Sequence, residues 1–324
     1  MRIFRKRQVA VLANPYSGMN TSRAGLATVI GAYLATPRWC YAPDTLTKLD
    51  AAAAEIVRRC PDVVAVAGGD GMAHQALTRL IREHADQPGY PMPQILILPT
   101  GTMNNVATTL GLMHRPADQL AQRIATKISS GAPLDTAHLA PMRVGDEFGF
   151  MYGAGLPVTI LRRYNEAGAG GPRTVVKTVL RLILNEVLTT ATFGRCRQSL
   201  FPPVPSQVEV FEKGESRVFP YSAYTAILAG TIETCGVGCR ALPLARQDPH
   251  EFMVRASALN FWGVAALLGP LWAGMPLPWT HDARTAQTRV TYETPMVAML
   301  DGDFLEPSRS VDISTGPLLT FVTG

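Results

Sequence analysis

Two carboxylates, Asp301 and Asp303, flank Gly302 directly after the apolar stretch "VAML" near the end of the chain. A carboxylate can act as a general base that takes the proton of an attacking hydroxyl, and a second carboxylate beside it can orient it. Asp-Gly pairs are also common in β-hairpin turns, so a purely structural turn is the alternative. The motif therefore offers either the base of a transfer reaction or a tight turn.

A glycine turn, Gly68-Gly69-Asp70-Gly71, follows the apolar run "VVAVA" and precedes a segment with amphipathic helical spacing over 72–84. Glycine lets the backbone approach a ligand closely, and the N–H groups at the start of a helix favour anionic oxygens. Asp70 would repel phosphate, but it suits a site where Mg²⁺ mediates. The alternative is a turn in which Asp70 caps the helix. We expect Met72 at the first helical position, where a hydroxyl would serve phosphate better.

Two further polar loops follow apolar runs. In "NPYSG" the candidates are Asn14 and the Ser17 hydroxyl beside Gly18. The loop "TGTMNN" offers backbone at Gly101, the Thr102 hydroxyl and the side-chain amides of Asn104 and Asn105. Each loop alone would be an ordinary turn, but three such loops after three apolar strands are a stronger signal of a binding site.

The elements that position these loops alternate between strand and helix over residues 8–130. This alternation predicts an α/β domain with a parallel sheet covered on both faces, and ligands bind outside the carboxyl ends of such strands. The expected strands end near residues 13, 67 and 99. The expected helices span 21–35, 50–60, 72–84, about 103–110 and 116–128.

After about residue 135 the pattern changes to short alternating segments with hairpin-like turns. These predict a mainly β second domain, interrupted by two helices at 173–190 and 259–268. We therefore expect two domains, 1–135 and 136–305. The 47% hydrophobic content of the 324 residues supplies ample material for packed cores.

Charge and cysteine content narrow the functional classes. The formal net charge of +5 is modest and no long Lys/Arg stripe is evident, so nucleic acid is not an expected partner. Five scattered cysteines favour a reducing, cytoplasmic setting over a disulfide framework. Cys235 and Cys239 lack a second pair that would complete a zinc site, so plain buried thiols are the simpler interpretation.

Two segments raise the question of a membrane. Residues 259–279 are apolar over a spanning length, but three prolines in the second half would break a helix, which favours a buried or interfacial segment. The apolar run after the N-terminal basic residues is too short for a signal-peptide core. Those basic residues (Arg2, Arg5, Lys6 and Arg7) form either a solubilising lead-in or a small patch attracted to an anionic membrane surface.

Taken together, "NPYSG", "GGDGM", "PTGTMNN" and "DGD", in this order and spacing, resemble the motifs of the diacylglycerol kinase, sphingosine kinase and NAD kinase superfamily. The chain is most similar to the soluble bacterial lipid-kinase branch. The resemblance runs over nearly the whole chain. It implies an N-terminal nucleotide domain, to which the tail of about 306–324 returns, a β-sandwich-like lipid-substrate domain, and a cleft between them for ATP, Mg²⁺ and a lipid hydroxyl.

The resemblance also implies residue roles. Asp303 would be the base, supported by Asp301, and Asp70 would act with Asp135 in a magnesium–water network. Asp248 matches a position that in some members holds a structural cation, although Pro249 stands there in place of a glycine. The nucleotide would be held by Asn14, Ser17, Gly18, Gly68, Gly69, Asp70, Gly71, Met72, Gly101, Thr102 and Asn105.

Four positions depart from the family pattern. Met72 replaces a usual threonine, Gln75 a glutamate, Asn105 an aspartate, and Asp303 the glutamate of a DGE motif. A lost phosphate hydrogen bond is worth ~0.5–1.5 kcal/mol. A carboxylate displaced by about 1 Å can cost about 10²-fold in rate. All four changes weaken the same chemistry.

The function that the resemblance implies is an ATP- and Mg²⁺-dependent kinase of a diacylglycerol-like or sphingoid lipid. It would act at a membrane surface as a cytoplasmic, peripheral protein, with the aromatic residues Phe261, Trp262 and Trp272 as candidates to accept acyl chains. The alternative is a degenerate kinase fold that binds nucleotide or lipid without efficient transfer. A soluble-substrate kinase such as an NAD kinase, and a Rossmann dehydrogenase, fit the motifs less well. The sequence leaves the lipid, the choice of nucleotide and homodimer formation open.

Overall fold

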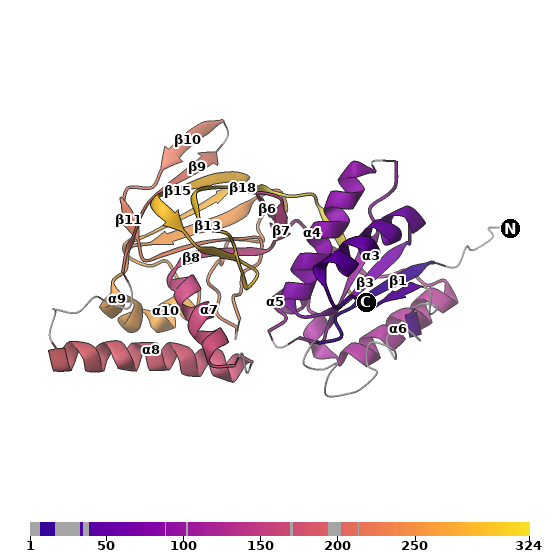
Figure 1. Ribbon diagram of the computed structural model, residues 1–324, viewed down its shortest axis with the longest axis horizontal. Coiled ribbons are helices and arrows are strands. Elements are labelled where there is room, and N and C mark those ends of the chain that lie inside the picture. Colours follow the sequence, from indigo (N-terminus) through magenta and orange to yellow (C-terminus); the bar gives the residue numbers. More distant parts are fainter. Residues whose placement is uncertain are drawn as a thin grey trace. The chain divides into compact units, whose positions relative to one another are not determined.

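A computed structural model describes residues 7–16, 33–34, 39–87, 89–101, 103–168, 171–193, 202–212, 214–236 and 238–324. The chain divides into two compact units (Figure 1). Unit 1 comprises Met1–Leu139 and Pro317–Gly324, and unit 2 comprises Ala140–Gly316. The ranges expected from the sequence are 1–135 with the tail of about 306–324, and 136–305. Each unit is described by itself.

Unit 1 is built on a six-stranded sheet in the order β2-β1-β3-β4-β19-β5. β1, β3 and β4 pair in parallel, and β19, from the end of the chain, lies parallel to β4 and antiparallel to β5. The central strands are buried along their whole length, which explains their continuous apolar sequence. The α/β prediction is confirmed. The strands are β1 (Val9–Ala13), β2 (Cys40–Tyr41), β3 (Val63–Gly68), β4 (Gln94–Pro99), β5 (Thr136–Leu139) and β19 (Leu319–Val322).

Helices of unit 1 begin and end at residues with recognisable local causes. The Thr45 hydroxyl accepts a hydrogen bond from the backbone N–H of Lys48 at the start of α3. Gly131, at φ 72°, ends α6. The helix expected over 21–35 lies outside the described residues, apart from 33–34. The helices are α3 (Leu46–Arg59), α4 (Asp70–Asp86), α5 (Asn105–Thr109), the short 3₁₀ turn η2 (Leu112–His114) and α6 (Ala117–Ser130).

The helix expected over 50–60 begins earlier, at Leu46. At the predicted phosphate loops, two further helix starts are wrong. α4 begins at Asp70, so Met72 is its third residue and not its first. α5 begins at Asn105, because the preceding Asn104 has a left-handed backbone with φ 53° and cannot be part of a right-handed helix. Both differences concern the loops predicted to bind phosphate.

Unit 2 contains two antiparallel sheets, with strand orders β10-β9-β15-β18-β6-β7 and β14-β13-β12-β8-β16-β17; β11 also pairs with β9. This confirms the β-rich second domain. The first sheet contains β6 (Met142–Val144), β7 (Glu147–Gly149), β9 (Val204–Glu212), β10 (Glu215–Val218), β11 (Ala223–Tyr224), β15 (Gln287–Met296) and β18 (Ser308–Thr315). The second contains β8 (Met151–Gly155), β12 (Ala226–Gly230), β13 (Phe252–Ser257), β14 (Thr280–Thr285), β16 (Ala298–Leu300) and β17 (Asp303–Phe304).

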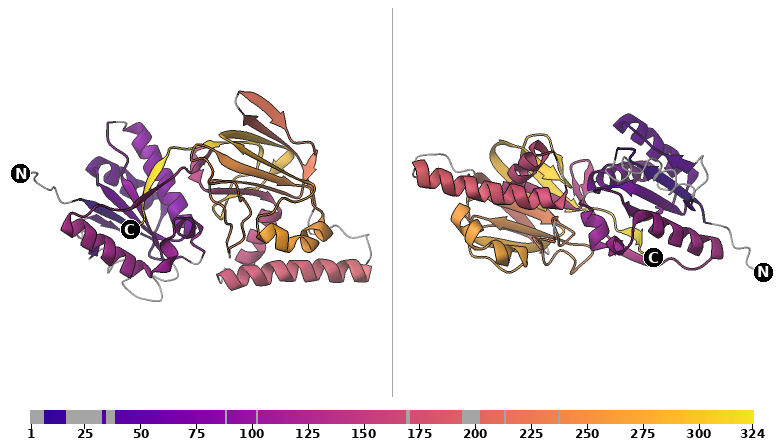
Figure 2. Two further views of the ribbon diagram at one scale, coloured as in Figure 1. Left: turned by 180° about the vertical axis from the view of Figure 1, so that it is seen from behind. Right: turned by 90° about the horizontal axis from the view of Figure 1, so that it is seen from below.

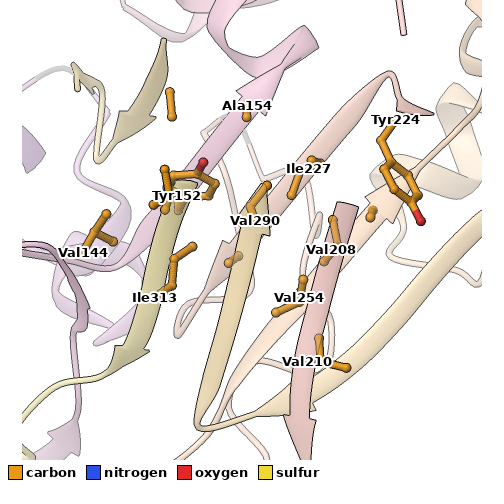
Figure 3. Packing of buried hydrophobic residues seen from close by; sticks show 14 of the residues in the cluster. Val144, Tyr152, Ala154, Val208, Val210, Tyr224, Ile227, Val254, Val290 and Ile313 are labelled. Carbon is orange, nitrogen blue, oxygen red and sulfur yellow. The ribbon is translucent and has the colours of Figure 1, made fainter. Parts of the chain in front are cut away.

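The core of unit 2 is a cluster of buried side chains drawn from both sheets (Figure 3). Val208 and Val290 come from the first sheet, and Ile227 and Val254 from the second. Burial alternates along β9, the period that a strand with one face in a core requires. This packing includes side chains of β8 and of β16, the strand that precedes the turn with Asp301 and Asp303.

The helices of unit 2 gather at one end of the unit (Figure 2). The sequence did not predict α7, and the single helix expected at 259–268 is two short helices. Among the described residues, no helix is both long enough and apolar enough to cross a membrane. The helices are α7 (Leu156–Glu166), α8 (Pro172–Phe193), α9 (Phe261–Ala266) and α10 (Leu268–Trp272).

Candidate functional site

Two of the three predicted phosphate loops are in direct contact. They follow the neighbouring parallel strands β3 and β4, so both lie at the same edge of the sheet. The Thr100 N–H donates to the Gly68 carbonyl at 3.2 Å. A β-carbon at Gly101 would overlap the α-carbon of Gly69 and lie 2.8 Å from its nitrogen. Glycine is therefore required at position 101 because the two backbones meet there.

Asp70 joins the two loops through its carboxylate. It accepts hydrogen bonds from the Asn105 N–H at 2.9 Å, the Asn105 side-chain amide at 3.1 Å and the Val106 N–H at 3.2 Å. These donors lie at the start of α5, whereas α4 has Gly69 as its N-cap and no side-chain cap. Asp70 thus caps the neighbouring helix and not its own. Burial raises the pKa of Asp70, and the hydrogen bonds from Asn105 and Val106 oppose that rise.

Asn104 holds the third loop in shape, a role that the sequence analysis missed. Its side-chain oxygen accepts from the Gly101 N–H at 3.2 Å, and its amide donates to the Gly101 carbonyl at 2.8 Å. The side chain is buried, and its amide holds the loop. We had expected this amide to contact a ligand. The available signal was the residue type, because Asn tolerates the left-handed backbone that this position adopts.

The Asn14 loop and Met72 lie beside Gly68. Asn14 donates its N–H to the Ala67 carbonyl at 2.9 Å, and its side-chain oxygen accepts from the Tyr16 N–H at 2.8 Å. A β-carbon at Gly68 would overlap that of Met72 and lie 2.6 Å from its γ-carbon. The methionine side chain therefore covers the glycine turn. The predicted residues Ser17, Gly18 and Thr102 lie outside the described residues.

Each of the predicted metal ligands Asp70, Asp135 and Asp248 accepts a hydrogen bond from the protein. Asp135 is exposed and accepts a hydrogen bond from Lys127 at 2.9 Å, which lowers its pKa. It precedes β5, three strand positions from β3, a lateral distance of roughly 14 Å. Asp248 belongs to unit 2, where its carboxylate accepts from the His250 N–H at 2.8 Å. Across the described part of the chain, no three His, Cys, Asp or Glu side chains form a metal-binding group.

Whether Mg²⁺ fits depends on how many lone pairs Asp70 has left for a cation. The carboxylate of Asp70 has about four lone-pair sites and already accepts three hydrogen bonds. It can contribute one further bond, so Mg²⁺ fits here only if phosphate oxygens and water supply most of its ligands, as is usual for this ion. The magnesium–water network of Asp70 and Asp135 stays a prediction.

The carboxylate pair of unit 2 lies on a hairpin. Leu300 pairs with Asp303 across a two-residue turn in which Asp301 has φ 48° and Gly302 φ 93°. Positive φ at both central residues is the requirement of a type I′ turn. The tight turn considered for this motif is therefore present, and Asp303 is the half-buried first residue of β17. A role of Asp303 as a base stays a prediction.

Asp301 uses both carboxylate oxygens to hold the neighbouring backbone. They accept the N–H groups of Phe150 and Met151, each at 2.8 Å, and the Asp301 N–H donates to the Met151 carbonyl at 2.9 Å. The aspartate thereby fixes the turn that carries Asp303 to the start of β8.

The aromatic candidates for an acyl pocket separate into two groups. Phe261 is buried and packs with Leu182 in a small core. Trp262 and Trp272 are exposed to solvent.

A comparison with protein families finds a match in the N-terminal part of the chain. Residues 8–134 match the model of the diacylglycerol kinase catalytic domain. The predicted resemblance is thereby confirmed. The match to this catalytic domain covers the three loops after β1, β3 and β4, and it ends before Asp135. No curated protein matches the sequence.

Solved structures from Bacillus anthracis str. Sterne share the fold of the whole chain. Two of them, of a provisionally named diacylglycerol kinase, align with a TM-score of 0.66 and 14% identity over 98% of this chain and 96% and 97% of theirs. A third, named a diacylglycerol kinase, aligns with a TM-score of 0.60 and 14% identity over 98% of this chain and 96% of its own. At this identity the likeness shows the fold alone, an α/β unit followed by a β-rich unit.

Proposed function

We propose that the protein is a lipid kinase that transfers the terminal phosphate of ATP to the hydroxyl of a diacylglycerol-like or sphingoid lipid. The observation that carries this proposal is the contact between Gly69 and Gly101 within the matched diacylglycerol kinase catalytic domain. Backbone without side chains on two adjacent loops lets phosphate oxygens approach closely, and the N–H groups at the start of α4 would favour them. The β-rich unit would bind the lipid whose hydroxyl is phosphorylated and would provide the base.

The nucleotide would be held by the loops of unit 1. The N–H groups at the start of the 17-residue α4 would face the phosphates, with Asn14 and Gly101 beside them. Mg²⁺, when bound mainly by the phosphates and by one bond to Asp70, would neutralise charge on the transferring group. The Met72 side chain occupies the turn where a hydroxyl would have added a phosphate hydrogen bond.

Asp303 would act as the base. It would take the proton of the lipid hydroxyl as the oxygen attacks the terminal phosphorus, while the bond from that phosphorus to the bridging oxygen breaks and ADP leaves. Asp301 would be a positioning residue, because its carboxylate holds the Phe150 and Met151 backbone and thereby the turn before Asp303.

The test is transfer of labelled phosphate from ATP to diacylglycerol, ceramide and sphingosine in mixed micelles, for the native chain and Asp303→Asn. We expect one lipid class to be phosphorylated and the variant to lose about 10²–10⁴-fold in kcat with nucleotide affinity and thermal unfolding unchanged. Transfer that survives in Asp303→Asn would remove this residue as the base.

A degenerate kinase is the second candidate, and the hydrogen bond between Asp70 and the Asn105 amide favours it. This amide occupies one acceptor position of the carboxylate that would otherwise be open to a cation. Calorimetric titration with Mg-ATP, combined with the lipid transfer assay, distinguishes the candidates. Binding without transfer to any lipid of the panel would support the degenerate kinase, and binding with transfer would exclude it.

A further inference from the structure

Helix α8 exposes an apolar stripe along its outer face. Val176, Leu180 and Leu184 recur every four residues, and the two leucines are each 55% exposed. Thr178 and Leu182, on the opposite side of the helix, are buried. Because side chains four apart lie on one face, the three apolar residues form a continuous ridge. The helix therefore has one apolar face in the core and a second apolar face in contact with solvent.

A basic stripe runs beside the apolar ridge. Arg173, Lys177 and Arg181 are exposed and also recur every four residues, each three residues before a member of the ridge. At 3.6 residues per turn this offset places the two stripes about 60° apart on the helix. The exposed face of α8 thus combines leucine-rich and cationic side chains.

Exposed tryptophans lie on the neighbouring segment 261–279. Three of the four tryptophans of the chain lie within 262–279, and Trp262 and Trp279 are 55% and 62% exposed. Phe261 of α9 packs on Leu182 of α8, so the two helices are neighbours. The view from below in Figure 2 shows α8 alongside α9 and α10.

We propose that α8 and the 261–279 segment together form a docking surface for an anionic lipid bilayer. Exposed apolar patches on monomeric proteins mark interaction sites. Apolar ridges beside Lys and Arg, with tryptophans at the margin, are characteristic of helices that lie in the membrane interface. The cationic stripe favours a negatively charged lipid surface over a neutral partner. This proposal extends the lipid-kinase proposal without depending on it, because docking requires no nucleotide.

The test is co-sedimentation of the full chain, without nucleotide, with vesicles of phosphatidylcholine alone or mixed with phosphatidylglycerol. We expect binding to the mixed vesicles that weakens as salt is raised, with a blue shift of tryptophan fluorescence. Lys177→Gln with Arg181→Gln should weaken binding by about fivefold for each charge removed. Leu180→Ser with Leu184→Ser should weaken it by at least about tenfold.

Matched controls lie on unit 1. Leu46 is 57% exposed on α3, and Arg82 is exposed on α4, so Leu46→Ser with Arg82→Gln changes the same residue types away from the proposed surface. The proposal is overturned if the native chain does not bind mixed vesicles at low salt, or if the control variant loses binding as much as the α8 variants. It is also overturned if the leucine variant only converts a dimer to a monomer, because the surface would then pack against a second copy.

Discussion

Asp70 in unit 1 and Asp301 in unit 2 both use the carboxylate to hold a distant backbone segment, but they do so from different local structures. Each accepts two backbone N–H groups from a distant part of its own unit: Asn105 and Val106 for the first, Phe150 and Met151 for the second. Asp70 lies at the start of a helix and also takes the Asn105 amide. Asp301 lies in a left-handed turn and bonds only backbone in these contacts.

In both units, a motif aspartate holds the local backbone in place through its carboxylate. In unit 1 the aspartate joins the two glycine loops whose bare backbone is the proposed phosphate-binding group. In unit 2 it anchors a hairpin, so the residue after the turn becomes the candidate base. Substitution of Asp70 or Asp301 therefore perturbs structure and activity together, whereas substitution of Asp303 separates them.

The largest expected effect comes from Gly101→Ala, which removes the loop contact of unit 1. The added carbon would overlap the Gly69 backbone, which cannot move aside as a flexible side chain does. We expect a loss of about 3 kcal/mol in unfolding free energy and no detectable Mg-ATP binding, measured by thermal unfolding and calorimetry.

Gly69→Ala is the matched control for this variant. Its β-carbon would lie 3.1 Å from the Gly101 α-carbon, a separation that a small shift relieves. We expect less than about 1 kcal/mol of destabilisation. Equal effects of the two variants would show that the loops are not as close as described.

In unit 2 the corresponding change is Asp301→Ala. It leaves the Phe150 and Met151 N–H groups without their acceptors and places alanine in a left-handed backbone. We expect about 2 kcal/mol of destabilisation by denaturant unfolding. Asp301→Asn keeps an acceptor and tolerates the backbone, so it should retain most of the stability. If both variants lose transfer with native stability, Asp301 acts on the reaction directly.

The sequence could predict the sheet of unit 1, because continuous apolar strands and polar loops at their carboxyl ends are local patterns. It also placed the two contacting glycine loops and the Asp-Gly turn. It could not predict which partner each polar side chain takes. Asp70 caps the helix after β4, 35 positions away in the chain, and Asp301 bonds residues about 150 positions away. The separation of Asp70 from Asp135 likewise depends on β19, which inserts between β4 and β5 from the end of the chain.

The smallest expected effect, and the sharpest test of the difference between the two aspartates, comes from Asn105→Asp. The change places a second carboxylate where the Asn105 amide now donates to Asp70 at 3.1 Å. Repulsion between the two charges should cost about 1 kcal/mol without divalent ions. Mn²⁺ or Mg²⁺ should restore the melting temperature, because paired carboxylates are ligands that these ions prefer.

Asp70→Asn combined with Asn105→Asp is the control, since it returns the pair to a single carboxylate at the same place. We expect its melting temperature, like that of the native chain, to respond weakly to the ions. If the native chain is stabilised by Mn²⁺ as strongly as Asn105→Asp, then Asp70 already holds a cation beside the Asn105 amide. In that case unit 1 retains its metal chemistry despite the missing carboxylate, and the degenerate-kinase alternative loses the observation that favours it.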